Sequence, residues 1–151
     1  MPHDRPTISL GFTDQPFTAG VHICQIIGND DERQESLLKF LLSGLQAGER
    51  TSCFSEKVSE SVLAEFLGRY GISFDGAKET GALTLAGTHD IYFQDQRFDP
   101  ERMLQVLSDY YTDSIRQGYP AARVIGEMTP EVQHVPGGSR LLEYEAKVSL
   151  L

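Results

Sequence analysis

The chain has 151 residues, of which 40% are hydrophobic and 23% are charged, a composition typical of one soluble globular domain spanning residues 1–151. Its 22 acidic and 13 basic side chains give a formal net charge of −9, so we expect no direct contact with nucleic acid or with a membrane surface. No apolar stretch approaches the ~20 residues of a membrane-spanning helix and the N-terminus lacks a signal-peptide pattern, which predicts a cytoplasmic protein.

The first half of the chain alternates apolar runs with amphipathic stretches. Residues 21–27 form a β-branched run between two glycines, which predicts a buried strand. The polar residues that follow are candidates for the cap of a helix with a leucine stripe. The predicted elements of this half are a strand over residues 21–27, a helix that opens at residues 29–31 and ends at Gly48, a strand over residues 51–55, and a helix from Ser59 to Gly71.

The second half continues the alternation. Its strongest helix signal is Asp99-Pro100-Glu101, which combines an aspartate cap with proline at the first helical position. The predicted elements are a strand over residues 83–86, an extended piece over residues 91–93, a helix from Asp99 to Gly118, a strand over residues 121–128, and a last helix capped by Ser139.

Strands and helices that alternate in this way imply parallel strands joined by right-handed crossovers. We therefore predict a three-layer α/β fold, in which helices flank a mostly parallel sheet. Ligands bind to such sheets beyond the carboxyl ends of the strands. In this sequence the predicted ends are residues 28–31, 55–57, 86–90 and 127–129.

The loop at residues 28–32 resembles a phosphate-binding loop in position but not in chemistry. Binding of a nucleoside triphosphate needs several glycines, a lysine and a hydroxyl group for magnesium. The segment IIGNDDERQES has one glycine, four acids and no lysine, and each acid beside a phosphate would oppose it by about 1–4 kcal/mol. ATP hydrolysis is therefore not predicted and no cofactor is expected, since helix capping alone accounts for these acids.

Two cysteines, Cys24 and Cys53, lie in apolar runs where a reduced thiol packs as a small hydrophobe, so no disulfide is predicted. His22 and Cys24 are two residues apart on the predicted strand and point to one face. Cys53 or His89 would have to complete a metal site there. A structural role is the favoured interpretation and no metal is predicted, which leaves His22 as a hydrogen-bonding wall of a pocket.

Arg123 lies in a predicted strand, where a lone charge is costly to bury. Glu127, four residues further on, points to the same face and is a candidate partner. Glu143 and Glu145 of the last helix are the alternatives. A structural ion pair is the favoured role for Arg123 and is compatible with a ligand contact. Glu127 is the better functional candidate because it closes a strand at the edge where ligands bind.

The following segments carry a family resemblance: GVHICQII (20–27), FLLSGLQAGE (40–49), GAL (81–83), FDPERML (98–104), GYPAARVIGEM (118–128) and LLEYEAKV (141–148). In this order they resemble the MEDS family, the methanogen and methylotroph sensory domain of bacterial and archaeal signalling proteins. The resemblance implies a degenerate relative of RecA-like P-loop domains, without the phosphate loop, that senses simple hydrocarbon derivatives. It also implies regulation of a partner, either a histidine kinase or a transcription regulator.

Family members usually continue past the last helix with a further strand, turn and helix, whereas this sequence ends at Leu151. Either the domain is shortened or another chain supplies the missing edge. The apolar end VSLL and an open sheet edge both need cover, so a homodimer is expected.

The function predicted first is that of a single noncatalytic sensory domain with a small organic ligand at the strand ends. Tyr92 and His89 join the candidates because they lie in the irregular middle segment, where side chains are free to meet a ligand. The predicted ligand-binding residues are His22, Glu56, His89, Tyr92, Arg123 and Glu127. Binding would order residues 87–98 and change a partner-binding surface.

Two alternatives remain open. One is a nucleotide-binding RecA-like protein with residual phosphotransfer or ATPase activity. The other is a protein–protein interaction module with a vestigial pocket. Stabilisation by ATP with magnesium, by small hydrocarbon derivatives, or by neither separates the three hypotheses.

Overall fold

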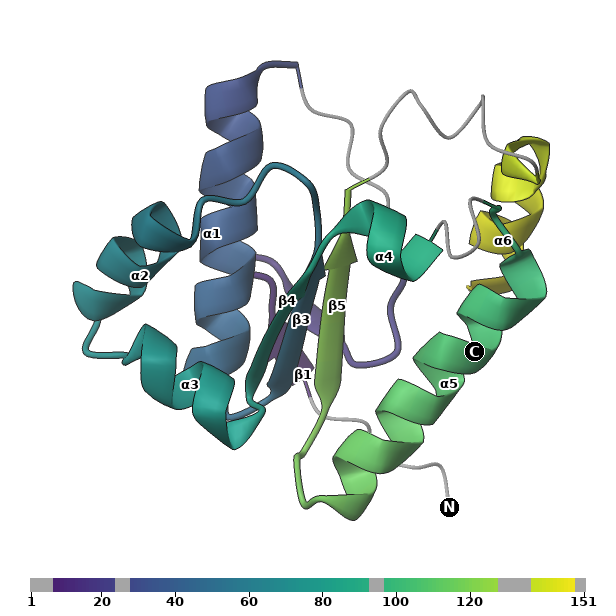
Figure 1. Ribbon diagram of the computed structural model, residues 1–151. Helices are drawn as coiled ribbons and strands as arrows, with labels where there is room; N and C mark the ends of the chain where they lie inside the picture. Colours follow the sequence, from purple (N-terminus) through teal and green to yellow (C-terminus); the bar gives the residue numbers. More distant parts are fainter. Residues whose placement is uncertain (1–6, 24–27, 93–96, 128–136, 149–151) are drawn as a thin grey trace.

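The computed structural model describes residues 7–23, 28–92, 97–127 and 137–148. Within these ranges the chain forms a mixed α/β fold (Figure 1). Its elements are β1 (Thr7–Ser9), β2 (Pro16–Thr18), α1 (Asp30–Gln46), β3 (Arg50–Phe54), α2 (Glu60–Gly68), α3 (Phe74–Thr80), β4 (Leu83–Ala86), α4 (Thr88–Tyr92), α5 (Pro100–Arg116), β5 (Ala122–Gly126), the 3-10 turn η3 (Gly138–Arg140) and α6 (Leu141–Val148).

The main sheet is parallel, as the alternating pattern predicts. Its order is β4-β3-β5, with Cys53 of β3 opposite Leu85 on one side and Ile125 on the other. Helices α1, α2 and α3 lie on one side of this sheet, and α5 and α6 lie on the other (Figure 1). A second, two-stranded antiparallel sheet is formed by β1 and β2.

Each face of the sheet has its own hydrophobic core, because successive side chains of a strand point in opposite directions. Cys53 contributes to the core on the α1 side and its neighbour Phe54 to the core on the α5 side. The buried residues of the first core are Leu37, Leu41, Leu42, Cys53, Leu63, Leu67 and Leu83. Those of the second are Phe54, Tyr92, Phe98, Met103 and Tyr144.

Three helix starts predicted from capping residues are confirmed. The side chain of Asn29 accepts a hydrogen bond from the Glu32 amide at the start of α1. Ser59 accepts from the Val62 amide at α2, and Asp99 accepts at the start of α5, where Pro100 occupies the first turn. These caps satisfy amides that would otherwise lack a partner inside the helix.

The predicted strand over residues 21–27 is wrong for residues 21–23, and residues 24–27 lie outside the described ranges. Val21 and Ile23 are 42% and 40% exposed. The ladder described here pairs β3 only with β4 and β5, so residues 21–23 have no strand partner in it. β-branched residues favour a strand only where a neighbouring strand and a buried face receive them.

Two further local predictions are also wrong. The expected extended piece over residues 91–93 is helical at residues 91 and 92, which belong to α4, and residue 93 lies outside the described ranges. Tertiary packing can override local strand propensity, and the Tyr92 side chain is buried. Ser139 does not cap the last helix. It lies inside η3, which follows Gly137 in the left-handed conformation and leads directly into α6.

Candidate functional site

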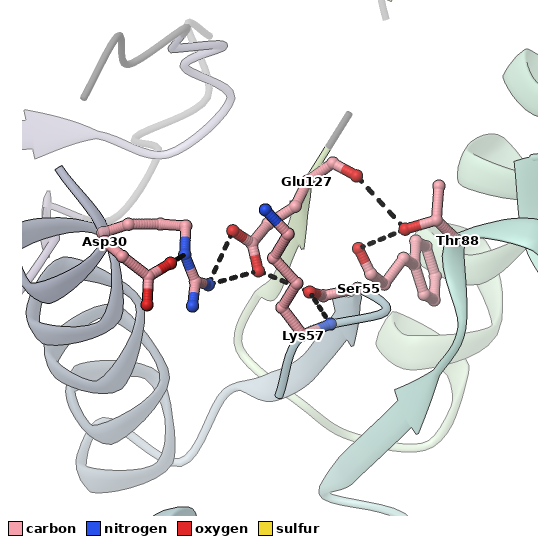
Figure 2. A network of polar contacts seen from close by, with 7 residues as sticks. Asp30, Ser55, Lys57, Thr88 and Glu127 are labelled. Carbon is pink, nitrogen blue, oxygen red and sulfur yellow. Dashed lines mark hydrogen bonds and ion pairs between the residues drawn. The ribbon is translucent and has the colours of Figure 1, made fainter. Parts of the chain in front are cut away.

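Polar residues from three strand ends and one helix start meet at the carboxyl edge of the parallel sheet (Figure 2). Ser55 follows β3, Thr88 follows β4 at the start of α4, and Glu127 follows β5. Arg33 reaches the same place from the first turns of α1. Strand ends of this kind are the usual ligand-binding edge of a parallel sheet.

The Glu127 carboxylate is the centre of this network. Arg33 Nη1 donates to both of its oxygens, at 2.9 and 2.8 Å, and the Ser55 hydroxyl donates to Oε1. The Arg33 and Glu127 side chains are only 18% and 16% exposed. A partly buried ion pair with an added hydroxyl donor is stronger than a pair on the open surface, because less solvent screens it.

Arg33 also holds Asp30 of its own helix, through Nε to Oδ1 at 2.8 Å. The hydrogen bond and the charge of Arg33 lower the pKa of Asp30. In return the hydrogen bond that Arg33 donates to Asp30, and to a lesser degree the one that it donates to Glu127, raises the pKa of Arg33 against the opposing effect of burial. One guanidinium therefore links the start of α1 to the end of β5.

Backbone hydrogen bonds fix the strand ends relative to one another. The Glu127 amide donates to the Phe54 carbonyl at 2.9 Å, and the Ser55 amide donates to the Ala86 carbonyl at the same distance. The Thr88 hydroxyl lies 3.1 Å from the Glu127 carbonyl oxygen. The Lys57 amide donates to the Ser55 hydroxyl oxygen at 3.0 Å, so the loop after β3 is held as well. These hydrogen bonds therefore fix the backbone that carries the Ser55, Thr88 and Glu127 side chains.

The start of α1 is unsuited to a phosphate group, as the loop composition predicts. The amide of Glu32 already donates to the Asn29 side chain at 2.8 Å. Asp30, Asp31 and Glu32 all lie in the first turn and are exposed. An anion placed here would meet three carboxylates and would compete with the cap.

Two of the predicted site residues lie at this edge. Glu127 is the central carboxylate of the network. Glu56 follows Ser55, and its carboxylate lies against Gly87, where an added Cβ atom would be 2.8 Å from Glu56 Oε1. Glycine at position 87 is therefore what lets this carboxylate approach the end of β4.

Tyr92 lies in the second core and not in an irregular segment. It is 4% exposed and packs edge-on against Phe54 and Tyr144. Burial, then the neighbouring Tyr144, raises the pKa of its hydroxyl. That hydroxyl lies where a side chain at Gly126 would be, so the tyrosine closes over the end of β5. Contact of Tyr92 with a ligand remains a prediction.

Arg123 lies near the other end of β5, and its predicted partners are wrong. It forms a bidentate ion pair with Glu49, at 2.8 and 3.1 Å, and not with Glu127, Glu143 or Glu145. Arg123 and Glu127 are four residues apart, a separation of ~13 Å along a strand, and each finds a nearer partner. The prediction that Arg123 needs an ion pair is confirmed, since its side chain is 4% exposed.

Of the two predicted histidines, only His22 has a side chain that the structure describes. His22 Nε2 lies 2.9 Å from Glu145 Oε2, which connects the segment before α1 to α6. His89 belongs to α4, and its side chain lies outside the described part of the chain. Sequence reasoning missed Arg33, although its position three residues after Asp30 was a signal for a helical ion pair.

The described residues contain no group of three or more histidine, cysteine or acidic side chains placed to hold a metal ion. Cys53 is buried and free, and burial raises the pKa of its thiol to about 12. It therefore packs as a neutral hydrophobe at neutral pH. No helix in the described ranges is long and apolar enough to cross a membrane.

Comparison with known families places the chain in a class of sensory proteins. The family model for the methanogen/methylotroph, DcmR sensory domain (MEDS) matches residues 21–151. The match covers most of the chain, so this protein belongs to the MEDS family. No curated protein and no solved structure gives a significant match to the chain.

Proposed function

We propose that this protein is a noncatalytic sensory domain that binds a small organic, hydrocarbon-derived ligand at the carboxyl ends of its parallel strands. The observation that carries the proposal is the Arg33–Glu127–Ser55 network, which concentrates partly buried polar groups at that edge. Membership of a sensory family supports a regulatory role. The acidic start of α1 argues against a triphosphate as the ligand.

In this proposal Glu127 and Glu56 supply polar contacts to the ligand, and Tyr92 and His89 adjust around it. His22 and Arg123 lie outside the network, so they would act through the segments that they hold. Binding would shift the conformation of residues 87–98 and thereby the surface offered to a histidine kinase or a transcription regulator. A homodimer remains the proposed assembly.

A thermal-shift screen tests the proposal against its alternatives. The panel contains small alcohols, amines and halogenated hydrocarbons, with ATP and magnesium as a separate arm. A ligand at 100 times its Kd adds about 2.7 kcal/mol of stability, which corresponds to a rise in Tm of roughly 5–10 °C.

The expected result is a shift with a member of the organic panel that is lost in Glu127→Gln and kept in Glu60→Gln, an exposed glutamate of α2. A shift with ATP and magnesium alone would replace the sensory proposal by the nucleotide-binding alternative. No shift with any compound would leave the interaction module as the better account.

A further inference from the structure

The N-terminal hairpin β1–β2 packs against α1 through tertiary contacts that the sequence pattern does not predict. The carbonyl oxygen of Ser9 accepts hydrogen bonds from the Ser43 hydroxyl at 2.7 Å and from Arg123 Nη2 at 2.8 Å. Leu10 is 2% exposed, and the Phe12 ring stacks on Phe40 with centroids 6.3 Å apart. The family match begins at residue 21, so it assigns no role to this hairpin.

Arg123 is the common anchor of the hairpin, of α1 and of the sheet. Besides Glu49 and Ser9, its Nη1 donates to the Phe40 carbonyl of α1 at 2.9 Å, and its guanidinium lies 4.7 Å from the Phe40 ring centroid. A guanidinium buried to this degree makes its contacts in one geometry, because losing any of them leaves a buried donor unpaired.

Strand β5 and the residue directly after it therefore contact α1 at two levels, each through a charged residue. Glu127 holds Arg33, and Arg123 holds the carbonyl of Phe40. The two strand positions are ~13 Å apart at 3.3 Å per residue, and the two helix positions are ~10.5 Å apart at 1.5 Å per residue. The two spacings are similar, as expected for α1 running antiparallel to β5 past both levels (Figure 1).

We propose that α1 couples the Glu127 site to the docking of the N-terminal hairpin, so that loss of the Arg33–Glu127 pair releases the hairpin. The two states are a docked hairpin, with both levels of β5 engaged, and an open hairpin, in which α1 has shifted and the Ser9 contacts are broken. A ligand that binds Glu127 would then change the docking of the hairpin, and this effect of a ligand rests on the proposed function. The coupling between Glu127 and the hairpin is expected in the ligand-free protein as well.

Hydrogen–deuterium exchange of the full chain, without ligand, tests the coupling. The variants are Glu127→Gln, Ser43→Ala as a direct loosening of the hairpin, and Glu60→Gln as a charge-matched control in the exposed pair with Lys78. The measured quantities are the exchange rates of the backbone amides in residues 7–18, in the first turns of α1 and in β3. Exchange in β3 reports on global unfolding. Arg33→Lys keeps the charge but replaces by one nitrogen the two, Nε and Nη1, that separately contact Asp30 and Glu127, and it takes the place of Glu127→Gln if that variant does not fold.

In Glu127→Gln we expect exchange in the hairpin and in the first turns of α1 to be faster by at least about five-fold, the low end for coupled sites, with β3 unchanged. Ser43→Ala should accelerate exchange in the hairpin alone, and Glu60→Gln should accelerate exchange neither in the hairpin nor in α1. The proposal is overturned if the hairpin of Glu127→Gln exchanges at the wild-type rate. It is also overturned if exchange in β3 accelerates as much as exchange in the hairpin. Because no ligand is present, these results are independent of the thermal-shift screen.

Discussion

Arg33 joins two parts of the chain that are 94 positions apart in sequence. Its guanidinium contacts a carboxylate of its own helix and another at the end of β5, and it is mostly buried while doing so. A side chain in this position contributes both charge pairing and the packing of its apolar stem. Its removal should therefore cost more than the removal of an arginine on the open surface.

We expect Arg33→Met to lower the free energy of unfolding by about 1–3 kcal/mol, since among the described residues it leaves the partly buried Glu127 carboxylate with only the Ser55 side chain as a donor. Methionine preserves helix propensity and most of the stem. Urea unfolding followed by circular dichroism measures the change. The matched control is Arg69→Met, whose pair with Glu65 is 66% and 71% exposed and should change stability by less than about 0.5 kcal/mol. Equal losses in the two variants would contradict the role assigned to Arg33.

Glu143 shows how a single residue can make stability depend on pH. Arg140, and then Lys147, lower its pKa from 4.5 to about 2. A carboxylate with a lowered pKa in the folded state stabilises that state above the unfolded pKa, and the contribution is lost as the pH falls through the folded pKa. The loss is therefore expected between about pH 4.5 and pH 2.

In Glu143→Gln this part of the pH dependence should disappear. The measurement is urea unfolding of the variant and the wild type at several pH values, and the difference between them should shrink steadily from pH 5 to pH 2. Glu79→Gln, an exposed acid of α3, serves as the control. A difference that stays constant over this range would show that the Arg140–Glu143 contact does not persist in solution.

At the scale of elements, the docking of the hairpin depends on one glycine. Gly11 has a φ of +84°, and a Cβ atom there would collide with the Lys39 carbonyl of α1. Gly48 also has a positive φ, +72°, but no atom lies within 4 Å of the place where its Cβ would be. The two positions therefore separate the strain of a left-handed backbone from a steric clash between elements.

Gly48→Ala should lower stability by about 1 kcal/mol through backbone strain alone. Gly11→Ala should cost clearly more, because either α1 or the hairpin must move away from the collision. Urea unfolding gives both values, and exchange of the hairpin amides locates the second effect. Similar costs at the two positions would mean that the hairpin is not held against α1 as described.

The elements that sequence reasoning predicts correctly are those whose local signals agree with their packing. Helices α1, α2 and α5 have a side-chain cap and an apolar stripe, and the residues of β3, β4 and β5 fit buried strands. Helix α3 was missed because Phe74–Thr80 is short and buries no residue fully, although Ser73 caps it. The hairpin was missed because β1 and β2 have three residues each and are held by tertiary contacts.

The candidate site could be predicted only in part, for a related reason. Position at a strand end marks Glu127 and Glu56 without knowledge of the tertiary structure. The partner of a buried charge depends on which elements become neighbours in the fold. Arg123 therefore pairs with Glu49, and Arg33 pairs with Glu127. Residue type and spacing within one element do not contain this information.

At the scale of the whole molecule, β3 connects two hydrophobic cores. Cys53 faces the core that contains Leu63, and Phe54 faces the core that contains Met103. Both Leu63 and Met103 are fully buried. Since the same backbone strand supports both faces, loss of packing on one side should weaken the other, and the described domain should unfold in one cooperative step.

We expect Leu63→Ala and Met103→Ala each to lower the free energy of unfolding by about 2–5 kcal/mol, through lost burial and the cavity that remains. Val62→Ala, at a neighbouring position that is 37% exposed, should change it by less than about 1 kcal/mol.

Far-ultraviolet circular dichroism follows the helices. Near-ultraviolet dichroism follows the tyrosines, since the chain has no tryptophan and Tyr92 and Tyr144 lie in the second core. In every variant the two signals should be lost at the same urea concentration. A tyrosine signal that disappears first in Met103→Ala, while the helices persist, would show that the two cores unfold separately and that β3 does not unite them.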